Sequence, residues 1–370
     1  MAFTAEDHFY MTRALQLAEQ GLYSTMPNPR VGCVIVKDGP KGKIIVGEGA
    51  HLKAGEPHAE VFAIEQAGNQ AKGATAYVTL EPCSHTGRTP PCSQAIIDAG
   101  IIRVVAAMQD PNPLVAGSGL AHLQAHNIKV ASGLMQTQAE ALNPGFISRM
   151  TQNKPFIRSK IAASLDGKTA LNNGKSQWIT SESARLDVQH WRARSCAILT
   201  GIGTVLSDNP SMNVRLENTN RQPLKIIVDS TLQTPIDAKI LQGGNVLIAF
   251  ANDINNRADA LFEAGVELLC IPNKEGKVCL ITLLSHLASQ QINEVLVEGG
   301  QGLNGALLAQ GLIDEMLIYY APKLMGSAAK GMFAMPAFTN MNQAIDLQIL
   351  DVRHIGVDIQ LRVKPQCHVD

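Results

Sequence analysis

The sequence predicts an α/β protein with two domains. Strand-like apolar runs alternate with helix-like segments through both halves of the chain, an order typical of mainly parallel sheets flanked by helices. The length of 370 residues exceeds the usual size of a single domain. Asn143-Pro144-Gly145 and Asn153-Lys154-Pro155 interrupt the pattern between the halves. We therefore expect a first domain over residues 1–150 and a second over 153–370.

In the first half, short apolar runs predict strands and a 3.6-residue periodicity predicts helices. The expected strands are residues 31–37, 43–50, 74–80, 103–108 and 129–131, and the expected helices are residues 7–20, 58–68, 92–99, 120–127 and 136–142.

The second half repeats the alternation. The expected strands are residues 156–162, 197–201, 224–229, 245–251, 266–271, 294–298 and 315–321, and the expected helices are 183–193, 256–264, 281–289 and 303–310. Residues 341–363 lack a helix signal between apolar stretches, so we expect them to end the sheet with an antiparallel pair.

The most informative motif is His58-Ala59-Glu60, followed after a predicted strand by Pro82-Cys83, eight residues and Cys92. A catalytic zinc takes three protein ligands and leaves its fourth position to water, which it acidifies. His58, Cys83 and Cys92 supply three ligands, and Glu60 adds a carboxylate that can move protons. Nucleobase deaminases carry H-x-E followed by P-C-x-x-C. The pattern here differs only in its long spacer between the cysteines.

Both ligand motifs fall where a predicted helix begins. A helix N-terminus presents free amides and a partial positive charge, which favour thiolates. Residues two apart point to nearly opposite sides of a helix, so His58 and Glu60 share a site only if His58 lies at an irregular entry. Gly55-Glu56-Pro57 predicts such an entry.

A structural zinc site is the alternative interpretation of these residues. Such a site needs four protein ligands, and His85 inside the spacer is the candidate for the fourth. A structural site has no use for Glu60, which favours the catalytic interpretation. The remaining cysteines are expected to be small core side chains or, in the polar tail, exposed: Cys33, Cys196, Cys270 and Cys279 in cores, and Cys367 in the tail.

A glycine-rich turn in the second half predicts a phosphate site. Residues 295–306 run from an apolar strand through this turn into a helix, whose N-terminus attracts anions. Gly300, Gly302 and Gly305 spell G-x-G-x-x-G. A Rossmann fingerprint, however, opens its domain and places an acid about 20 residues later. Because this turn follows several predicted strands, we expect a phosphate site without a Rossmann fold.

The segment from Leu80 to Cys92, with its long spacer, resembles one family: the bifunctional deaminase/reductase of riboflavin biosynthesis. Asn28-Pro29-Arg30-Val31-Gly32-Cys33-Val34-Ile35-Val36 resembles the opening strand of that family, and the resemblance continues at residues 160–168, 176–180 and 201–210. It covers nearly the whole chain. It implies a cytidine-deaminase-like zinc domain followed by a dihydrofolate-reductase-like α/β domain that uses NADPH.

The resemblance also implies which residues form the sites. Those expected at the cofactor are Ala162, Trp178, Thr204, Asp208, Ser230, Gly300, Gln301, Gly302, Leu303, Asn304, Gly305 and Ala306. Those expected at the reductase substrate are Ser176, Arg192, Met212, Arg215 and Glu298, and those expected around the deaminase pocket are Asn28, His51, His85 and Arg88. Exposed surface charge is the alternative for the arginines, as core packing is for the tryptophan.

The implied reactions are two consecutive steps on a phosphoribosylated pyrimidine. The first is zinc-dependent hydrolytic deamination of 2,5-diamino-6-(5-phosphoribosylamino)pyrimidin-4(3H)-one. The second is NADPH-dependent reduction of the ribosyl chain, which gives 5-amino-6-(5-phosphoribitylamino)uracil. A preference for NADPH over NADH does not follow from the residues themselves.

Composition excludes several other classes of protein. A net charge of −1 without a basic run argues against a nucleic-acid partner. No segment reaches the ~18 unbroken apolar residues of a membrane span, and the acidic start lacks a secretory signal. Seven cysteines without disulfide-like spacing indicate a reducing compartment, so we expect a cytoplasmic enzyme. Homo-oligomer formation is left open.

Two rival functions stay open. One is a free-nucleoside or RNA-directed deaminase joined to an unrelated reductase, which the long spacer and the absence of a basic run disfavour. The other is a binding protein that retains zinc for stability and senses a dinucleotide, which the presence of Glu60 disfavours.

Overall fold

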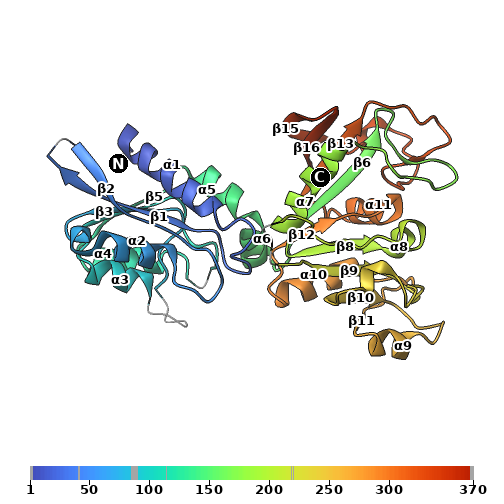
Figure 1. Cartoon of the computed structure of the whole chain (residues 1–370), viewed down its shortest axis with the longest axis horizontal. Helices are drawn as coiled ribbons and strands as arrows, with labels where there is room; N and C mark the ends of the chain where they lie inside the picture. The colour runs from blue at the N-terminus through green and yellow to red at the C-terminus, as the bar shows by residue number, and fades with distance from the viewer. Residues whose placement is uncertain are drawn as a thin grey trace. The chain divides into compact units, whose positions relative to one another are not determined.

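The computed structural model describes residues 3–40, 42–84, 91–113, 115–217, 219 and 221–366. The chain divides into two compact units, Met1–Asn153 and Lys154–Asp370. Each unit has its own sheet with helices on both faces (Figure 1).

The first unit contains a five-stranded sheet of order β2-β1-β3-β4-β5. The strands β1 and β2 form an antiparallel hairpin, β1 also runs antiparallel to β3, and β3, β4 and β5 are parallel. Their bounds are Gly32–Gly39 (β1), Gly42–Ala50 (β2), Thr75–Val78 (β3), Arg103–Ala106 (β4) and Lys129–Ser132 (β5). The parallel strands place their carboxyl ends at one edge, where Cys83 follows β3.

Helices α1 and α5 cover one face of this sheet, and α2, α3 and α4 cover the other (Figure 1). The helices are α1 (Ala5–Glu19), α2 (Ala59–Ala67), α3 (Cys92–Asp98), α4 (Ser118–Ala125), α5 (Gln136–Leu142) and α6 (Pro144–Gln152), with the 3₁₀ turn η1 (Gly68–Ala71). Each expected element of this half is present. The prediction missed α6, because Pro144 at the first position of a helix starts it rather than breaks it.

The second unit contains a nine-stranded sheet of order β11-β10-β9-β8-β12-β6-β13-β16-β15. The strands from β11 to β13 are parallel, and β16 and β15 complete the sheet as the expected antiparallel pair. The bounds are β6 (Phe156–Ser164), β8 (Ala197–Gly201), β9 (Leu224–Val228), β10 (Val246–Phe250), β11 (Glu267–Cys270), β12 (Glu294–Val297), β13 (Glu315–Ala321), β15 (Leu347–Ile355) and β16 (Asp358–Pro365).

Alternate residues of these strands face different cores. Leu199 of β8 packs in one apolar cluster with Leu287 and Leu307, whereas its neighbour Ile198 packs in another with Val205.

The helices of the second unit are α7 (Glu182–Arg194), α8 (Ile202–Asp208), α9 (Ala258–Glu263), α10 (Leu280–Ser289) and α11 (Gln301–Ala309), with η2 (Lys239–Leu241), η3 (Met341–Gln343) and the small pair β7 (Lys168–Ala170) and β14 (Lys330–Gly331). The prediction missed α8, which carries two of the expected cofactor residues.

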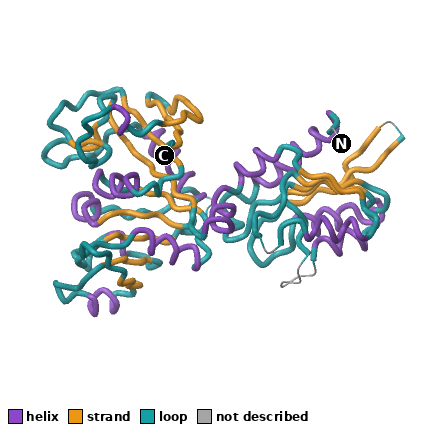
Figure 2. The backbone as a smooth tube through the Cα atoms, turned by 180° about the vertical axis from the view of Figure 1, so that it is seen from behind, coloured by secondary structure: helices purple, strands orange, loops and turns teal. Residues whose placement is uncertain are grey.

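Tracing the backbone by secondary structure shows the same layered α/β build in both units (Figure 2). None of the described helices is long and apolar enough to cross a membrane.

All six described cysteines are free. Cys33 and Cys196 are buried as expected, but the prediction for Cys270 was wrong, because this edge-strand residue is exposed, and Cys279 is only half-buried. Cys367 lies outside the described residues.

Candidate active sites

The structure brings His58, Cys83 and Cys92 together at the start of two helices. His58 is the N-cap of α2 and has an extended backbone (φ −77°, ψ 164°), which is the irregular entry that the sequence required. Cys92 is the first residue of α3. The Nδ1 atom of His58 lies 3.2 Å from the Cys92 sulfur and 3.7 Å from the Cys83 sulfur. One imidazole nitrogen and two sulfurs within 4.8 Å of one another suit a zinc ion.

The two thiols differ in acidity. Hydrogen bonds from Cys92 and from His58 lower the pKa of the Cys83 thiol, whereas contact with Cys83 and burial raise the pKa of Cys92. The Cys92 amide also donates to the Cys83 sulfur over 3.3 Å, as the free amide of a helix start can. Cys83 is therefore already disposed to be the thiolate that a metal needs.

Glu60 lies in the first turn of α2 with 4% of its surface exposed. Burial, and next to it the Cys83 sulfur, raise the pKa of its carboxyl to about 7. Its Oε2 atom is buried and has no hydrogen-bond partner among the described residues. Burying such an oxygen is costly unless a ligand fills the need. The carboxylate is thus placed to meet a water or substrate atom beside the metal ligands.

Two of the expected deaminase-pocket residues lie beside His58. The rings of His51 and His58 meet edge to face with centroids 5.3 Å apart. The side-chain amide of Asn28 lies 3.1 Å from Nε2 of His51, whose Nδ1 lies 3.1 Å from the Pro57 carbonyl. The other two, His85 and Arg88, lie outside the described residues. The alternative of a fourth ligand at His85 therefore stays untested.

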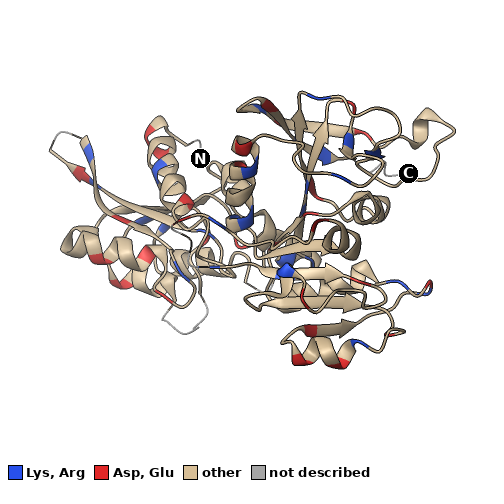
Figure 3. Ribbon diagram, turned by 45° about the vertical axis from the view of Figure 1, so that its right-hand side comes forward, with Lys and Arg blue, Asp and Glu red and all other residues tan. Residues whose placement is uncertain are grey.

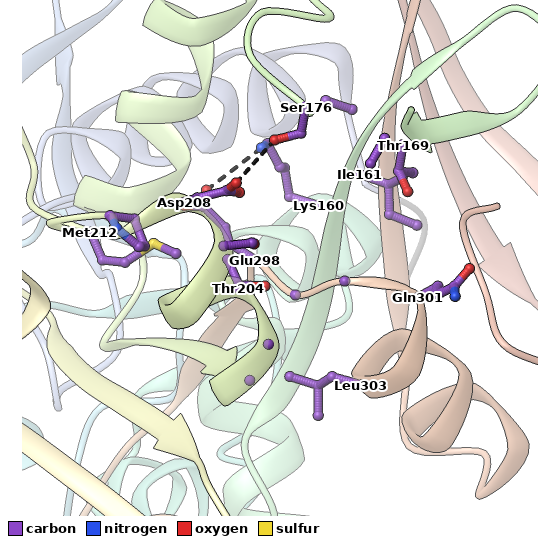
Figure 4. A pocket seen from close by; sticks show the side chains of 18 of the residues that line it. Lys160, Ile161, Thr169, Ser176, Thr204, Asp208, Met212, Glu298, Gln301 and Leu303 are labelled. Atoms are coloured by element: carbon purple, nitrogen blue, oxygen red, sulfur yellow. Dashed lines mark hydrogen bonds and ion pairs between the residues drawn. The ribbon is translucent and has the colours of Figure 1, made fainter. Parts of the chain in front are cut away.

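A large cavity occupies the second unit, with a volume of about 910 Å³. Side chains from β6, α8 and the turn before α11 converge on it (Figure 4). The expected reductase residues that line it are Ala162, Ser176, Trp178, Arg192, Thr204, Asp208, Met212, Arg215, Ser230, Glu298, Gly300, Gln301, Gly302, Leu303 and Ala306. These positions are spread from residue 162 to residue 306, and the parallel sheet brings them to one edge.

Asn304 and Gly305 do not line this cavity, although both were expected at the cofactor. Asn304 is buried and supports the turn from behind, because its amide donates to the Gly299 carbonyl over 3.2 Å and its oxygen accepts from Ser159 over 3.1 Å. A Cβ atom on Gly305 would lie 2.2 Å from the Ala334 carbonyl oxygen. Both residues position the turn through packing on its far side.

The glycine turn leaves room for an anion. Gly300 is the N-cap of α11, and no side chain caps that helix. A Cβ on Gly302 would meet nothing within 4 Å, and the nearest atom to one on Gly300 is the Thr204 hydroxyl at 3.9 Å. The free amides of the first turn therefore face an open part of the cavity, which fits a cofactor phosphate.

A buried carboxylate and two cations form the floor of the cavity. Arg192 donates from Nε and Nη2 to the Glu298 carboxylate over 2.6 and 2.9 Å and from Nη1 to the Asn213 carbonyl over 3.0 Å. Lys160 lies 3.6 Å from the same carboxylate (Figure 4). Burial alone would raise the pKa of Glu298, but the charges of Arg192 and Lys160 lower it to about 2.

The structure shows which partners the cavity's charged side chains contact, which the sequence did not predict. Arg192 was expected to hold the substrate, yet its guanidinium is engaged by Glu298 and Asn213. Arg215 also lines the cavity and is exposed. Lys160 was not singled out as a site residue, because one lysine on a predicted strand carries no signal of its own. Trp178 is 63% exposed, and the Arg185 guanidinium carbon lies 4.6 Å from the centroid of its ring, so the alternative of core packing for Trp178 is wrong.

Family profiles match both units. The cytidine and deoxycytidylate deaminase zinc-binding region matches residues 4–108, and the RibD C-terminal domain matches residues 155–361. Together with the two sites, these matches define a zinc deaminase joined to a reductase. This confirms the expected fold class, a cytidine-deaminase-like domain followed by a dihydrofolate-reductase-like α/β domain.

Full-length relatives extend the match. The riboflavin biosynthesis protein RibD of Escherichia coli is 49% identical, covering 97% of this chain and 99% of that protein. The solved structure of Acinetobacter baumannii RibD, form 1, is 47% identical with a TM-score of 0.90, covering 98% of this chain and 99% of that chain. A diaminohydroxyphosphoribosylaminopyrimidine deaminase/5-amino-6-(5-phosphoribosylamino)uracil reductase from Thermotoga maritima is 32% identical with a TM-score of 0.85, covering 97% and 99%. The chain belongs to the RibD family.

Proposed function

We propose that this chain catalyses both reactions of its family, each in one of the two sites. It deaminates 2,5-diamino-6-(5-phosphoribosylamino)pyrimidin-4(3H)-one in the first unit and reduces the ribosyl chain in the second, giving 5-amino-6-(5-phosphoribitylamino)uracil. We assign residues 1–150 to the deaminase and 153–370 to the reductase. The observation that carries the proposal is the buried Glu60 oxygen, which has no hydrogen-bond partner among the described residues and lies beside three side chains that could hold a metal ion.

In the first site, His58, Cys83 and Cys92 would hold zinc. When bound, zinc acidifies the water that attacks the ring carbon bearing the exocyclic amine. Glu60 would take one proton from that water and pass it to the ring nitrogen. It would then carry the second proton, from the hydroxyl now on the ring carbon, to the exocyclic amine, so that the carbon–nitrogen bond breaks and ammonia leaves. A carboxyl whose pKa is near 7 can do both, because it gains and loses a proton at little cost. We assign Asn28 and His51, which lie beside His58, to orienting the pyrimidine.

In the second site, the turn from Gly300 and the walls at Ala162, Thr204 and Asp208 would hold the cofactor. NADPH supplies the hydride, which goes to the first carbon of the ring-opened ribose. The protein binds and orients both molecules. Lys160 is the ammonium nearest Glu298, and it is placed to donate a proton as the ribityl chain forms.

The charge distribution supports a small phosphorylated substrate in place of a polymer. Lys and Arg are interspersed with Asp and Glu on both units, and the net charge is −1 (Figure 3). A polymeric nucleic acid draws on a continuous basic surface. We assign Arg215 to the substrate phosphate and Arg192 to holding Glu298, with Ser176 and Met212 completing the substrate wall. We also place the protein in the cytoplasm, since six described cysteines are free.

One experiment tests both halves. Purified protein is mixed with the diaminopyrimidinone ribotide and NADPH, and ammonia release and nicotinamide absorbance are followed together. Ammonia should appear first and NADPH oxidation should follow. Ammonia without NADPH oxidation would leave a deaminase with an unrelated second domain. Absence of both would favour the non-catalytic binding protein.

A further inference from the structure

Glu81 lies two residues before Cys83, is buried, and has no part in the roles assigned above. Its two carboxylate oxygens each accept two backbone amides. The donors to Oε1 are Gly119 (2.8 Å) and Leu120 (3.2 Å), and the donors to Oε2 are Gly117 (2.9 Å) and Asp110 (3.1 Å). Hydrogen bonds to a charged acceptor are stronger than neutral ones. Glu81 thus ties the segment of a proposed metal ligand to residues 29 to 39 positions later in the chain.

Three of the four donors form the start of helix α4. This helix has Gly117 as its N-cap and therefore no capping side chain of its own. The first amides of a helix need an outside acceptor, and the helix dipole favours an anion there. The Glu81 carboxylate satisfies both needs from a different segment. The start of α4 and the loop before Cys83 consequently hold one another in place.

Two further contacts join the same segments. A Cβ on Gly119 would lie 1.9 Å from the Pro82 carbonyl oxygen, so the helix start packs directly on the backbone just before Cys83. On the other side of the ligand, the hydroxyls of Ser84 and Ser118 are 2.7 Å apart. Both chain neighbours of Cys83 therefore contact the first turn of α4.

The second cysteine is linked to α4 as well. The Ser93 amide donates to the Cys83 carbonyl over 3.1 Å, and the Ser93 hydroxyl lies 3.0 Å from Nδ1 of His122 on α4. Helix α4 contributes no ligand, yet it contacts the chain next to both sulfurs. We propose that Glu81 is a positioning residue of the metal site: by docking α4 onto the Cys83 segment, it fixes the Cys83 sulfur for metal binding. This inference rests on the proposed zinc function of that site.

Metal affinity tests the proposal without substrate. In the Glu81→Gln variant the remaining oxygen accepts two amides, but the new amino group faces the other two donors. The full chain is titrated with Zn²⁺ against a chelator and, separately, with Co²⁺ to record the thiolate-to-cobalt absorption. Loss of a partner that orients a ligand typically costs 10–100-fold in metal affinity, so the zinc Kd should rise by about that factor. The cobalt band should also shift or weaken.

The control variant is Glu65→Gln, which removes the same charge from an exposed position on α2. It should bind both metals as the wild type does, and both variants should reduce the deaminated pyrimidine ribotide at the wild-type rate. If Glu81 only stabilises the fold, Glu81→Gln should lower thermal stability but leave the cobalt band of the loaded protein unchanged. That result would overturn the proposal. So would equal zinc affinities in Glu81→Gln and wild type.

If Glu81→Gln does not yield folded protein, Glu81→Asp tests the proposal. It keeps the charge but is one methylene too short to reach all four amides, so its zinc Kd should rise above that of the wild type. A wild-type Kd in Glu81→Asp overturns the positioning role. A wild-type chain that binds neither zinc nor cobalt through thiolate overturns the proposed function itself.

Discussion

The two sites are built from very different lengths of chain. The three proposed metal ligands and Glu60 lie between residues 58 and 92, at the starts of helices α2 and α3 and in the loop before α3. The reductase cavity draws its walls from residues 160 to 330, and its parts meet only because a parallel sheet gathers strand ends at one edge. When a site is encoded in a short stretch of chain, the spacing of its residues in the sequence is enough to predict its chemistry. When a site is spread over a whole unit, only the fold shows which of its residues come into contact.

The first prediction separates the sites most strongly. Glu60→Gln keeps the size of the side chain but cannot accept a proton from water, so deamination should fall roughly 100- to 10,000-fold, the usual range for general acid-base catalysis. The measurement is ammonia release from the diamino substrate. Given the already deaminated ribotide, the variant should oxidise NADPH at nearly the wild-type rate. Loss of both activities in a folded variant would break the two-site comparison, and Glu65→Gln serves as control.

The buried carboxylate of the second site makes that unit sensitive to acid. The pKa of Glu298 is lowered from 4.5 to about 2, so its contribution to stability is present above pH ~5 and is lost as pH falls toward 2. The size is on the order of 3 kcal/mol. Urea unfolding followed by tryptophan fluorescence reports on this unit, because Trp178 and Trp191 both lie in it. Glu298→Gln should flatten the pH dependence, whereas the exposed Glu275→Gln should keep it.

Replacing the two arginines of the cavity should have different effects on substrate binding and on stability. Arg215→Ala should raise the substrate KM of the reductase about 10- to 100-fold and hardly change that for NADPH, because a charge-assisted bond to phosphate contributes roughly 1.5–3 kcal/mol. Arg192→Ala should also raise the substrate KM more than that for NADPH, and in addition it should lower stability, since it leaves Glu298 buried with only Lys160. Arg353→Ala, an exposed arginine outside the cavity lining, is the control. An equal rise of both Michaelis constants would reject these assignments.

The smallest expected difference is between Gly302 and Gly305, which lie on opposite sides of the start of helix α11. Gly302→Ala adds a methyl group in open space at the cavity, so it should raise the KM for NADPH while the unit stays stable. Gly305→Ala places the same methyl 2.2 Å from the Ala334 carbonyl oxygen and should destabilise the unit, by about 1–3 kcal/mol. Steady-state kinetics and urea unfolding of both variants separate the effects. Similar stability losses would mean that Gly302 is also tightly packed.

The sequence by itself determined the donor set and the general architecture. The spacing from His58 to Glu60 and from Cys83 to Cys92 predicted three candidate ligands and one further carboxylate, because ligand chemistry is a property of residue type. The alternation of apolar runs defined two α/β halves and the closing antiparallel pair. These signals are local, so they survive without knowledge of the fold.

Only the tertiary structure decided which groups meet. It engaged Arg192 with Glu298, turned Asn304 and Gly305 to the far side of the cofactor turn, and joined Glu81 to helix α4. Each of these pairs is separated by about thirty to more than a hundred residues or depends on which side of a turn a residue faces. Hydrogen bonds and packing at such separations follow from the way the sheet brings distant segments together, and no local spacing encodes them.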